Sequence, residues 1–184
     1  MEKSANTQYE DLSAQANLKI GVISDTHSYI DPAIIQQLDN CDAILHAGDI
    51  GSIDVIQQLK KVCPKVISVR GNNDIQSKWS SNEYNELTKI PELAEIKLPG
   101  GDITMVHGDQ YFSVSVRHEK MREDFSSSKA IVYGHSHIMT FDKSENPWML
   151  NPGAAGKTRT KGGASCLLIH ADQQAWEVTQ FRVE

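Results

Sequence analysis

Five short polar segments contain the residue types that bind metal ions in proteins. They are Asp25-Thr26-His27, Gly48-Asp49, Gly71-Asn72-Asn73-Asp74, His107-Gly108 and Gly134-His135-Ser136-His137. Each segment follows an apolar run, and the candidate ligands are Asp25, His27, Asp49, Asn72, His107, His135 and His137. Oxygen and imidazole ligands together suit Mn²⁺, Fe or Zn²⁺ better than Ca²⁺, which prefers oxygen alone. These seven side chains are too many for one ion, whereas two ions sharing a bridging carboxylate would use them well.

Most segments taken alone are weak evidence, because Asp and His are common in loops and Gly-Asp is an ordinary turn. Gly134–His137 is a stronger signal, since its two histidines alternate as on an extended backbone. The joint pattern is much more specific, since all five segments occur in order and each stands behind an apolar run. Glycines within the segments allow tight turns and a close approach of backbone to a metal cluster. These glycines are Gly48, Gly71, Gly108 and Gly134.

The first half of the chain predicts alternating strands and helices. Apolar runs rich in Ile and Val indicate buried strands at 18–24, 43–47 and 65–70, with amphipathic helices at 31–38 and 52–61. A β-α-β-α-β order implies parallel strands with right-handed crossovers. The carboxyl ends of such strands meet at one crevice, where sites form.

The second half predicts more strands than helices. We expect hairpins at 94–107, 138–153 and 164–183, a strand at 130–134 and a helix at 114–127. A core of two sheets with helices outside accommodates these elements. Residues 75–91 read as a loop or short helix, and the polar, aperiodic residues 1–17 read as a disordered or loosely docked tail. Structure is therefore expected to begin at Leu18, with one domain over 18–184.

Composition excludes several classes of protein. The 18 Lys and Arg against 24 Asp and Glu give a net charge of −6, which argues against general binding of nucleic acid or of an anionic membrane surface. No apolar run is long enough to span a membrane. The cysteines are odd in number and lack CxxC pairing, which favours a reducing compartment. The first residues lack the apolar segment of a secretory signal, so a cytoplasmic location is expected. Whether identical copies assemble is left open.

The five segments resemble the ordered motifs of the calcineurin-like metallophosphoesterase superfamily. They look most like its small single-domain phosphodiesterase branch from bacteria and archaea, which also has an NPG element, here Asn151-Pro152-Gly153. The resemblance covers residues 18 to about 183. It implies an α/β fold, a four-layer αββα sandwich of two mixed sheets, with a dinuclear site at the carboxyl ends of the strands. It also implies two divalent ions, with Mn²⁺ expected first and Fe, Zn²⁺ or Ni²⁺ as alternatives.

The resemblance also implies how the ligands divide between the two ions. The first ion would be held by Asp25, His27, Asp49 and His137, and the second by Asp49, Asn72, His107 and His135. Asp49 would bridge them, and a hydroxide between the ions would attack a small phosphate-ester substrate.

One position departs from the family pattern. Many members have a His after the ligand Asn, and the small branch often has a Cys, but this chain has Asn73. An amide can donate a hydrogen bond yet cannot release a proton near neutral pH. We therefore expect Asn73 to lie beside the leaving group, as a catalytic and substrate-binding residue that does not protonate it. Diesters with good leaving groups should then be the preferred substrates.

Two other functions compete with the phosphodiesterase reading. A phosphomonoesterase or nucleotidase would need a proton donor from the 109–120 loop, with His118 as the donor and Arg117 as a phosphate contact; that stretch also reads as ordinary solvated charge. A protein-binding scaffold is the other alternative, since a retromer subunit shares this fold but has eroded metal motifs. Here every ligand position is filled, which counts against a pure scaffold.

Overall fold

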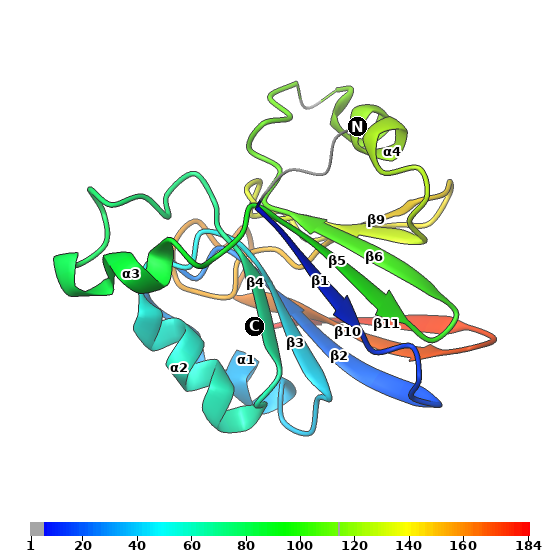
Figure 1. The fold of residues 1–184 in the computed structure, drawn as a ribbon, viewed down its shortest axis with the longest axis horizontal. Coiled ribbons are helices and arrows are strands. Elements are labelled where there is room, and N and C mark those ends of the chain that lie inside the picture. Colours follow the sequence, from blue (N-terminus) through cyan, green and yellow to red (C-terminus); the bar gives the residue numbers. More distant parts are fainter. Residues whose placement is uncertain (1–5, 114) are drawn as a thin grey trace.

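The computed structural model describes residues 6–113 and 115–184, and its centre is a pair of β-sheets packed face to face (Figure 1). The smaller sheet has the strand order β11-β10-β2-β3-β4. Its strands are β2 (Asn17–Ile23), β3 (Ala43–Ala47), β4 (Val66–Val69), β10 (Ser165–Asp172) and β11 (Trp176–Arg182). Strands β2, β3 and β4 run parallel, whereas β10 is antiparallel to both of its neighbours, so the sheet is mixed.

The larger sheet has the order β1-β5-β6-β7-β9-β8. Its strands are β1 (Thr7–Asp11), β5 (Leu93–Leu98), β6 (Gly101–Val106), β7 (Ala130–Val132), β8 (Thr140–Asp142) and β9 (Trp148–Asn151). Strands β6, β7 and β9 are parallel, while β5–β6 and β8–β9 pair antiparallel as the predicted hairpins require.

Helices cover the outer face of each sheet (Figure 1). They are α1 (Pro32–Gln37), α2 (Ile53–Val62), the 3-10 turn η1 (Ser81–Glu83), α3 (Tyr84–Leu87) and α4 (Arg117–Asp124). Helices α1 and α2 pack on the smaller sheet through buried residues such as Ile34 and Leu59. Helix α4 packs on the larger sheet through Met121. With the main core between the sheets, the order is helix, sheet, sheet, helix, which confirms the predicted four-layer sandwich.

Local sequence explains the two helices that follow β2 and β3. Asp31 caps α1 by accepting a hydrogen bond of 2.9 Å from Ala33 N, and Pro32 occupies the first turn, where its missing N–H costs nothing. Helix α2 buries its apolar side. Its last turn contains Lys60 and Lys61, whose positive charges interact favourably with the negative end of the helix dipole. These short helices return the chain to the start of the next parallel strand.

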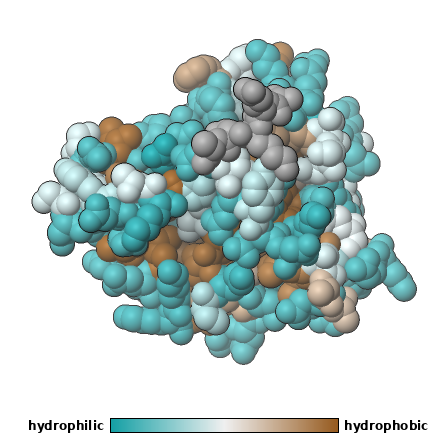
Figure 2. All heavy atoms as spheres, viewed as in Figure 1, coloured by the Kyte–Doolittle hydropathy of each residue, from teal (hydrophilic) through white to brown (hydrophobic). Residues whose placement is uncertain are grey.

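Figure 2 shows hydrophilic residues over most of the visible face, with apolar residues in patches between them. Among the described residues no helix is long and apolar enough to cross a membrane.

The prediction that structure begins at Leu18 is wrong. Residues 7–11 form β1, which pairs in parallel with β5 and extends the edge of the larger sheet. The sequence of this strand has no apolar pattern, so it could not be recognised. Backbone hydrogen bonds to β5 hold it in the sheet, and an ion pair of 3.0 Å joins Glu10 to Lys65. The start of the predicted tail, residues 1–5, lies outside the described residues.

A second correction concerns the segment after β6. The predicted helix at 114–127 is α4, which begins at Arg117; Val114 lies outside the described residues. Arg117 and His118 therefore stand on the first turn of a helix and not in the expected 109–120 loop.

Candidate metal centre

Four of the predicted ligands converge at the carboxyl ends of β2, β3 and β7. Asp25, His27, Asp49 and His137 each offer one ligand atom, and these atoms all lie within 4.8 Å of one another. We call this group the first cluster. His137 Nε2 lies 3.2 Å from Asp25 Oδ1, and His27 Nε2 lies 3.7 Å from Asp49 Oδ2. Strands β2 and β3 end at the same edge of the smaller sheet, and the segment after β7 of the larger sheet brings His137 to the same centre.

Neighbouring groups orient the first cluster. Asp25 Oδ2 accepts hydrogen bonds from Ser24 Oγ at 2.6 Å and from the His135 backbone N–H at 3.1 Å. This leaves Asp25 Oδ1 buried and without a hydrogen-bond partner. His137 Nδ1 donates to the Thr158 carbonyl at 2.9 Å, which fixes the tautomer and presents the Nε2 lone pair to the centre.

The remaining predicted ligands lie beside the first cluster but are less gathered. We call Asp49, Asn72, His107 and His135 the second cluster. His107 Nδ1 donates to the Ala47 carbonyl at 2.8 Å, and its buried Nε2 makes no hydrogen bond. The His107 and His135 rings meet edge to face, with centroids 5.3 Å apart. His135 Nδ1 lies 3.1 Å from Asn72 Oδ1, so two predicted ligands satisfy each other.

Asp49 stands between the two clusters. Its Oδ2 faces His27 in the first cluster, while its Oδ1 lies 3.4 Å from His107 Nε2 in the second. Burial alone would raise the pKa of Asp49, but the His107 imidazole and the Asn73 amide outweigh burial and lower it. The same contact raises the pKa of His107 to about 9 in spite of burial. A cation placed beside Asp49 would take over the role of that imidazole proton.

The imidazoles of His27 and His135 are neutral near pH 7 because burial lowers the pKa of each. Burial lowers the pKa of His27 and outweighs the attraction of Asp49 and Asp25. Burial also lowers the pKa of His135, helped by the charge of His107. Neutral imidazole is the form that binds metal ions.

The backbone at these residues is strained. Five of the seven predicted ligands have positive φ, which is uncommon for residues other than Gly. They are Asp25, His27, Asp49, His135 and His137, with φ between 46° and 65°. Strain of this kind gathers at functional sites, where the surroundings hold it in place.

Glycines within the motifs leave room for the ligands, as predicted. A Cβ at Gly71 would collide with Asp49 Oδ1, and a Cβ at Gly134 would lie 2.8 Å from Asp25 Oδ2. Any side chain at either position would displace a carboxylate of the first cluster.

Two residues that the sequence did not single out strongly hold the loops together. Asp74 is 2% exposed and accepts hydrogen bonds from the backbone N–H groups of Ile50, Gly51 and Gly71 and from the Trp79 indole, which ties the loop after β3 to the loop after β4. Asn151 donates to the Gly134 carbonyl at 2.7 Å and so fixes the Gly134–His137 segment. The NPG resemblance marked Asn151, but not what it contacts.

Asn73 lies beside Asp49, and both polar atoms of its side-chain amide make hydrogen bonds. Its Nδ2 donates to Asp49 Oδ2 at 2.6 Å, and its Oδ1 accepts from the Lys78 ammonium. The side chain therefore links Asp49 to an exposed cation. Its predicted place beside the leaving group stays a prediction.

Arg117 and His118 make their hydrogen bonds to residues outside the two clusters, although the charge of Arg117 helps to lower the pKa of His135. Arg117 is buried, and its Nε donates to the Tyr111 carbonyl at 3.0 Å. His118 Nε2 lies 2.7 Å from the Tyr133 hydroxyl, and burial lowers its pKa. Among the described residues, no hydrogen bond or ion pair joins either side chain to a predicted ligand.

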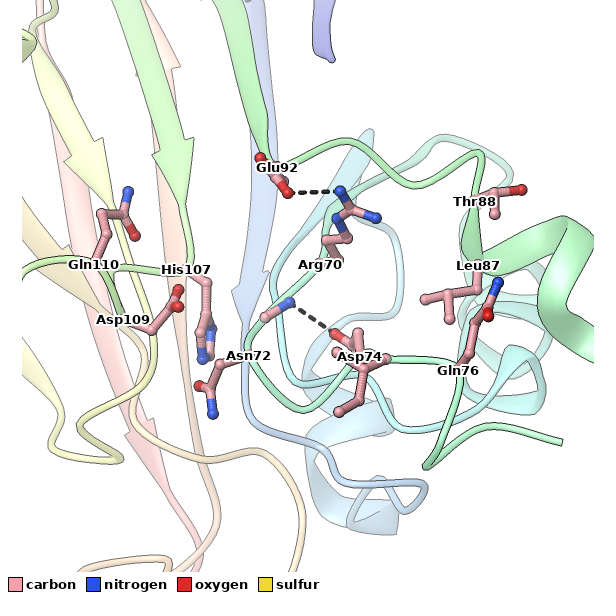
Figure 3. Close-up of a pocket in the computed structure, with 12 residues that line it drawn as sticks. Arg70, Asn72, Asp74, Gln76, Leu87, Thr88, Glu92, His107, Asp109 and Gln110 are labelled. Atoms are coloured by element: carbon pink, nitrogen blue, oxygen red, sulfur yellow. Dashed lines mark hydrogen bonds and ion pairs between the residues drawn. The ribbon is translucent and has the colours of Figure 1, made fainter.

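A cavity of about 750 Å³ opens beside the second cluster. Figure 3 shows Asn72 and His107 on one wall, with Asp109 and Gln110 nearby from the loop after β6. Gln76, Leu87 and Thr88 form the opposite side, and Arg70 is paired with Glu92 at 2.5 Å. A cavity of this size can hold a drug-sized organic group.

The residues present fit divalent cations. Two buried atoms without a hydrogen-bond partner, Asp25 Oδ1 and His107 Nε2, face the first and second cluster respectively. Leaving such atoms unpaired is costly, and a cation at each cluster would satisfy both. The mixed oxygen and nitrogen donors suit transition metals.

Comparison with known proteins identifies the family. The model of the calcineurin-like phosphoesterase superfamily domain matches residues 18–174. The chain belongs to this superfamily. Membership confirms the resemblance of the motifs and supports metal-dependent hydrolysis of phosphate esters by this chain.

Similar proteins include archaeal enzymes and a eukaryotic protein of known structure. A probable metallophosphoesterase of Methanothermobacter thermautotrophicus is 30% identical over 140 residues, covering 73% of this chain and 76% of the relative. A phosphodiesterase of Methanocaldococcus jannaschii is 26% identical over 148 residues, covering 74% and 83%. The structure of Vps29 from Entamoeba histolytica in complex with Zn²⁺ has a TM-score of 0.71 at 17% identity, covering 90% of this chain and 98% of that one. The last likeness shows the fold alone.

Proposed function

We propose that this chain is a phosphodiesterase that hydrolyses small phosphate diesters at a dinuclear metal site bridged by Asp49. The observation that carries the proposal is the position of the Asp49 carboxylate, with Oδ2 toward His27 and Oδ1 toward His107. One carboxylate that faces two clusters of ligands is what a shared ligand requires.

The proposed ligand sets are the two clusters. Asp25, His27, Asp49 and His137 hold the first ion, and Asp49, Asn72, His107 and His135 hold the second. Two divalent ions would supply an activated water and neutralise charge on the phosphoryl oxygens. Mn²⁺ is the proposed metal, with Fe, Zn²⁺ and Ni²⁺ as alternatives, because the mixed donors accept all of them. The cytoplasm, where thiols stay reduced, is the proposed location: the three cysteines are buried and free.

The chain's own residues position this chemistry. The carbonyls of Ala47 and Thr158 hold His107 and His137 with Nε2 forward. Ser24 Oγ and the His135 N–H hold Asp25 in one orientation. The cavity beside the second cluster offers room for an organic ester group of the substrate.

Three observations support a diester over a monoester. Asn73 follows the ligand Asn72 at the sequence position where many members of the superfamily have His, and an amide cannot protonate a poor leaving group. The donor required by the monoesterase alternative, His118, is held against the Tyr133 hydroxyl. The phosphodiesterase of Methanocaldococcus jannaschii is a relative with this activity in its name.

The scaffold alternative draws on the likeness to Vps29. Filled ligand positions, and a buried ligand atom without a hydrogen bond in each cluster, favour an enzyme, since a scaffold has no use for either.

The test is hydrolysis of bis(p-nitrophenyl) phosphate and of p-nitrophenyl phosphate by protein loaded with Mn²⁺. We expect two ions per chain and faster release of p-nitrophenol from the diester. A faster monoester reaction would support the nucleotidase alternative. Protein that retains no metal and cleaves neither ester would favour the scaffold.

A further inference from the structure

The loop between β9 and β10 carries an unusual concentration of positive charge. Residues 156–163, which we call the basic loop, contain Lys157, Arg159 and Lys161. No acidic residue occurs between Glu145 and Asp172, although the whole chain has a net charge of −6. Local cationic charge on an acidic protein attracts anionic ligands to that place.

The basic loop is fastened to the segment that carries Asp25 and His27. Just before it, Ala155 N donates to the Ser24 carbonyl at 2.9 Å. A Cβ at Gly156 would lie 2.8 Å from the Tyr29 carbonyl oxygen, so only Gly allows this close approach. The ammonium of Lys157 stands 4.9 Å from the centre of the Tyr29 ring. The loop is therefore held beside the first cluster.

Arg159 reaches the first cluster itself. Its Nη2 lies 3.0 Å from His137 Nε2, while the preceding residue, Thr158, holds His137 Nδ1 through its carbonyl. A guanidinium has donors only, so it donates to the lone pair that is proposed to bind the first ion. Arg159 also has a φ of 51°, a strained conformation that must be held by its surroundings.

We propose that Arg159 binds a phosphoryl oxygen of the substrate at the first cluster. An ion on His137 Nε2 would displace the guanidinium from that one atom, but the fastened loop keeps Arg159 at the rim of the same centre. There the side chain can match two oxygens of a phosphate with two parallel N–H groups. The inference rests on the proposed function, because it assigns a substrate contact to that same site. It also replaces Arg117, which is buried against Tyr111, as the arginine that contacts phosphate.

The experiment measures binding of inorganic phosphate to Mn²⁺-loaded protein by calorimetry, with bound metal counted in every variant. We expect Arg159→Ala to weaken the phosphate Kd about 10- to 100-fold, since a hydrogen bond to a charged group is lost. KM for bis(p-nitrophenyl) phosphate should rise by a similar factor. The phosphate Kd of Arg159→Lys should lie between those of wild type and Arg159→Ala, because lysine keeps the charge but lacks the two parallel N–H donors of the guanidinium.

Lys161→Ala is the matched control, since it removes one positive charge from the same loop. Its phosphate Kd should stay within about twofold of wild type, as expected for an exposed charge. An unchanged Kd in Arg159→Ala, an equal loss in Lys161→Ala, or a loss that only follows missing metal would each overturn the inference.

The two proposals fail in different ways. Wild-type protein that binds phosphate through Arg159 but cleaves no ester would overturn the proposed function alone. Wild-type protein that cleaves esters while Arg159→Ala binds phosphate normally would overturn the inference alone.

Discussion

The two clusters of the candidate centre share Asp49 but differ in how completely they are formed. In the first, four ligand atoms already lie within 4.8 Å of one another, and Asp25 and His137 are almost fully buried. In the second, Asn72 is exposed, and it contacts His135 instead of a common centre. A preformed site binds an ion without a free-energy cost for ordering its ligands. We therefore expect the first cluster to bind its ion more tightly.

The difference follows from how each cluster is supported. Ser24, Thr158 and the His135 N–H hold the first cluster from three directions. In the second cluster His107 is held by the Ala47 carbonyl, but Asn72 and His135 are held mainly by each other. Asp25, Asp49 and His137 of the first cluster are buried. Asn72 and His107 of the second cluster line the cavity in Figure 3.

The largest effect is expected at the residue that both clusters share. Asp49→Asn should lower phosphoesterase activity by more than about 100-fold and remove at least one ion, since even residues that only support a ligand cost about 10–100-fold. Elemental analysis and initial rates measure this, with Asp54→Asn on the exposed side of α2 as the control. Two retained ions at full activity would show that Asp49 does not bridge.

Substituting one histidine at a time separates the clusters. His137→Ala should abolish the tighter of two Mn²⁺ binding steps, because it removes a buried ligand of the first cluster. His135→Ala should leave that step intact and abolish the weaker one. Calorimetric titration of metal-free protein measures both, and the two variants control for each other. If His135→Ala removed the tighter step, the proposed order of affinity would be reversed.

Asn73→His tests where the leaving group departs. General acid catalysis is worth about 10²–10⁴-fold, and less for a leaving group that is already stable as an anion. The variant should gain at least about tenfold on an alkyl ester and little on p-nitrophenyl esters, compared over a pH series. An equal loss on both substrates would mean that Asn73 serves to orient Asp49, as its 2.6 Å hydrogen bond would allow.

The smallest effect concerns the support beneath the first cluster. His46 is fully buried, its Nε2 lies 2.9 Å from Thr26 Oγ1, and burial lowers its pKa to about 4. Between about pH 6.5 and 4, His46 therefore binds a proton in the unfolded chain but not in the folded chain. The free energy of unfolding should fall as pH drops through this window, by up to about 1.4 kcal/mol per pH unit from this residue.

His46→Gln removes that titration and should flatten the slope by up to one proton. Urea unfolding of metal-free wild type and variant between pH 6.5 and 4 measures the difference. Identical slopes would contradict a buried neutral His46.

Much of the fold could be read from the sequence because its strands are strongly apolar. The strands at 18–24, 43–47 and 65–70 and all three hairpins were placed by their patterns, and the structure confirms them. Strand β1 was missed because its residues are polar and its pairing partner lies more than 80 positions away. The start of α4 was misplaced because its sequence lacks a clear apolar face.

The candidate site, like the fold, could be predicted only in part. Residue types and spacing identified all four members of the first cluster, which the structure gathers around one centre. The ligand roles of Asn72, His107 and His135 stay a prediction. The contacts made by Asp74, Thr158 and Arg159 could not be predicted, since they join loops from distant parts of the chain. Positive φ at ligands such as His137 is likewise imposed by the assembled loops. The absence of acidic residues between Glu145 and Asp172 was the one signal that could have drawn attention to Arg159.

The most direct test of the dinuclear site is a crystal structure of Mn²⁺-loaded protein, with the ions located by anomalous scattering. We predict two peaks about 3.5–4 Å apart, with one Asp49 oxygen on each and with His137 and His135 on different ions. A single peak, or both histidines on the same ion, would contradict the bridged two-metal centre.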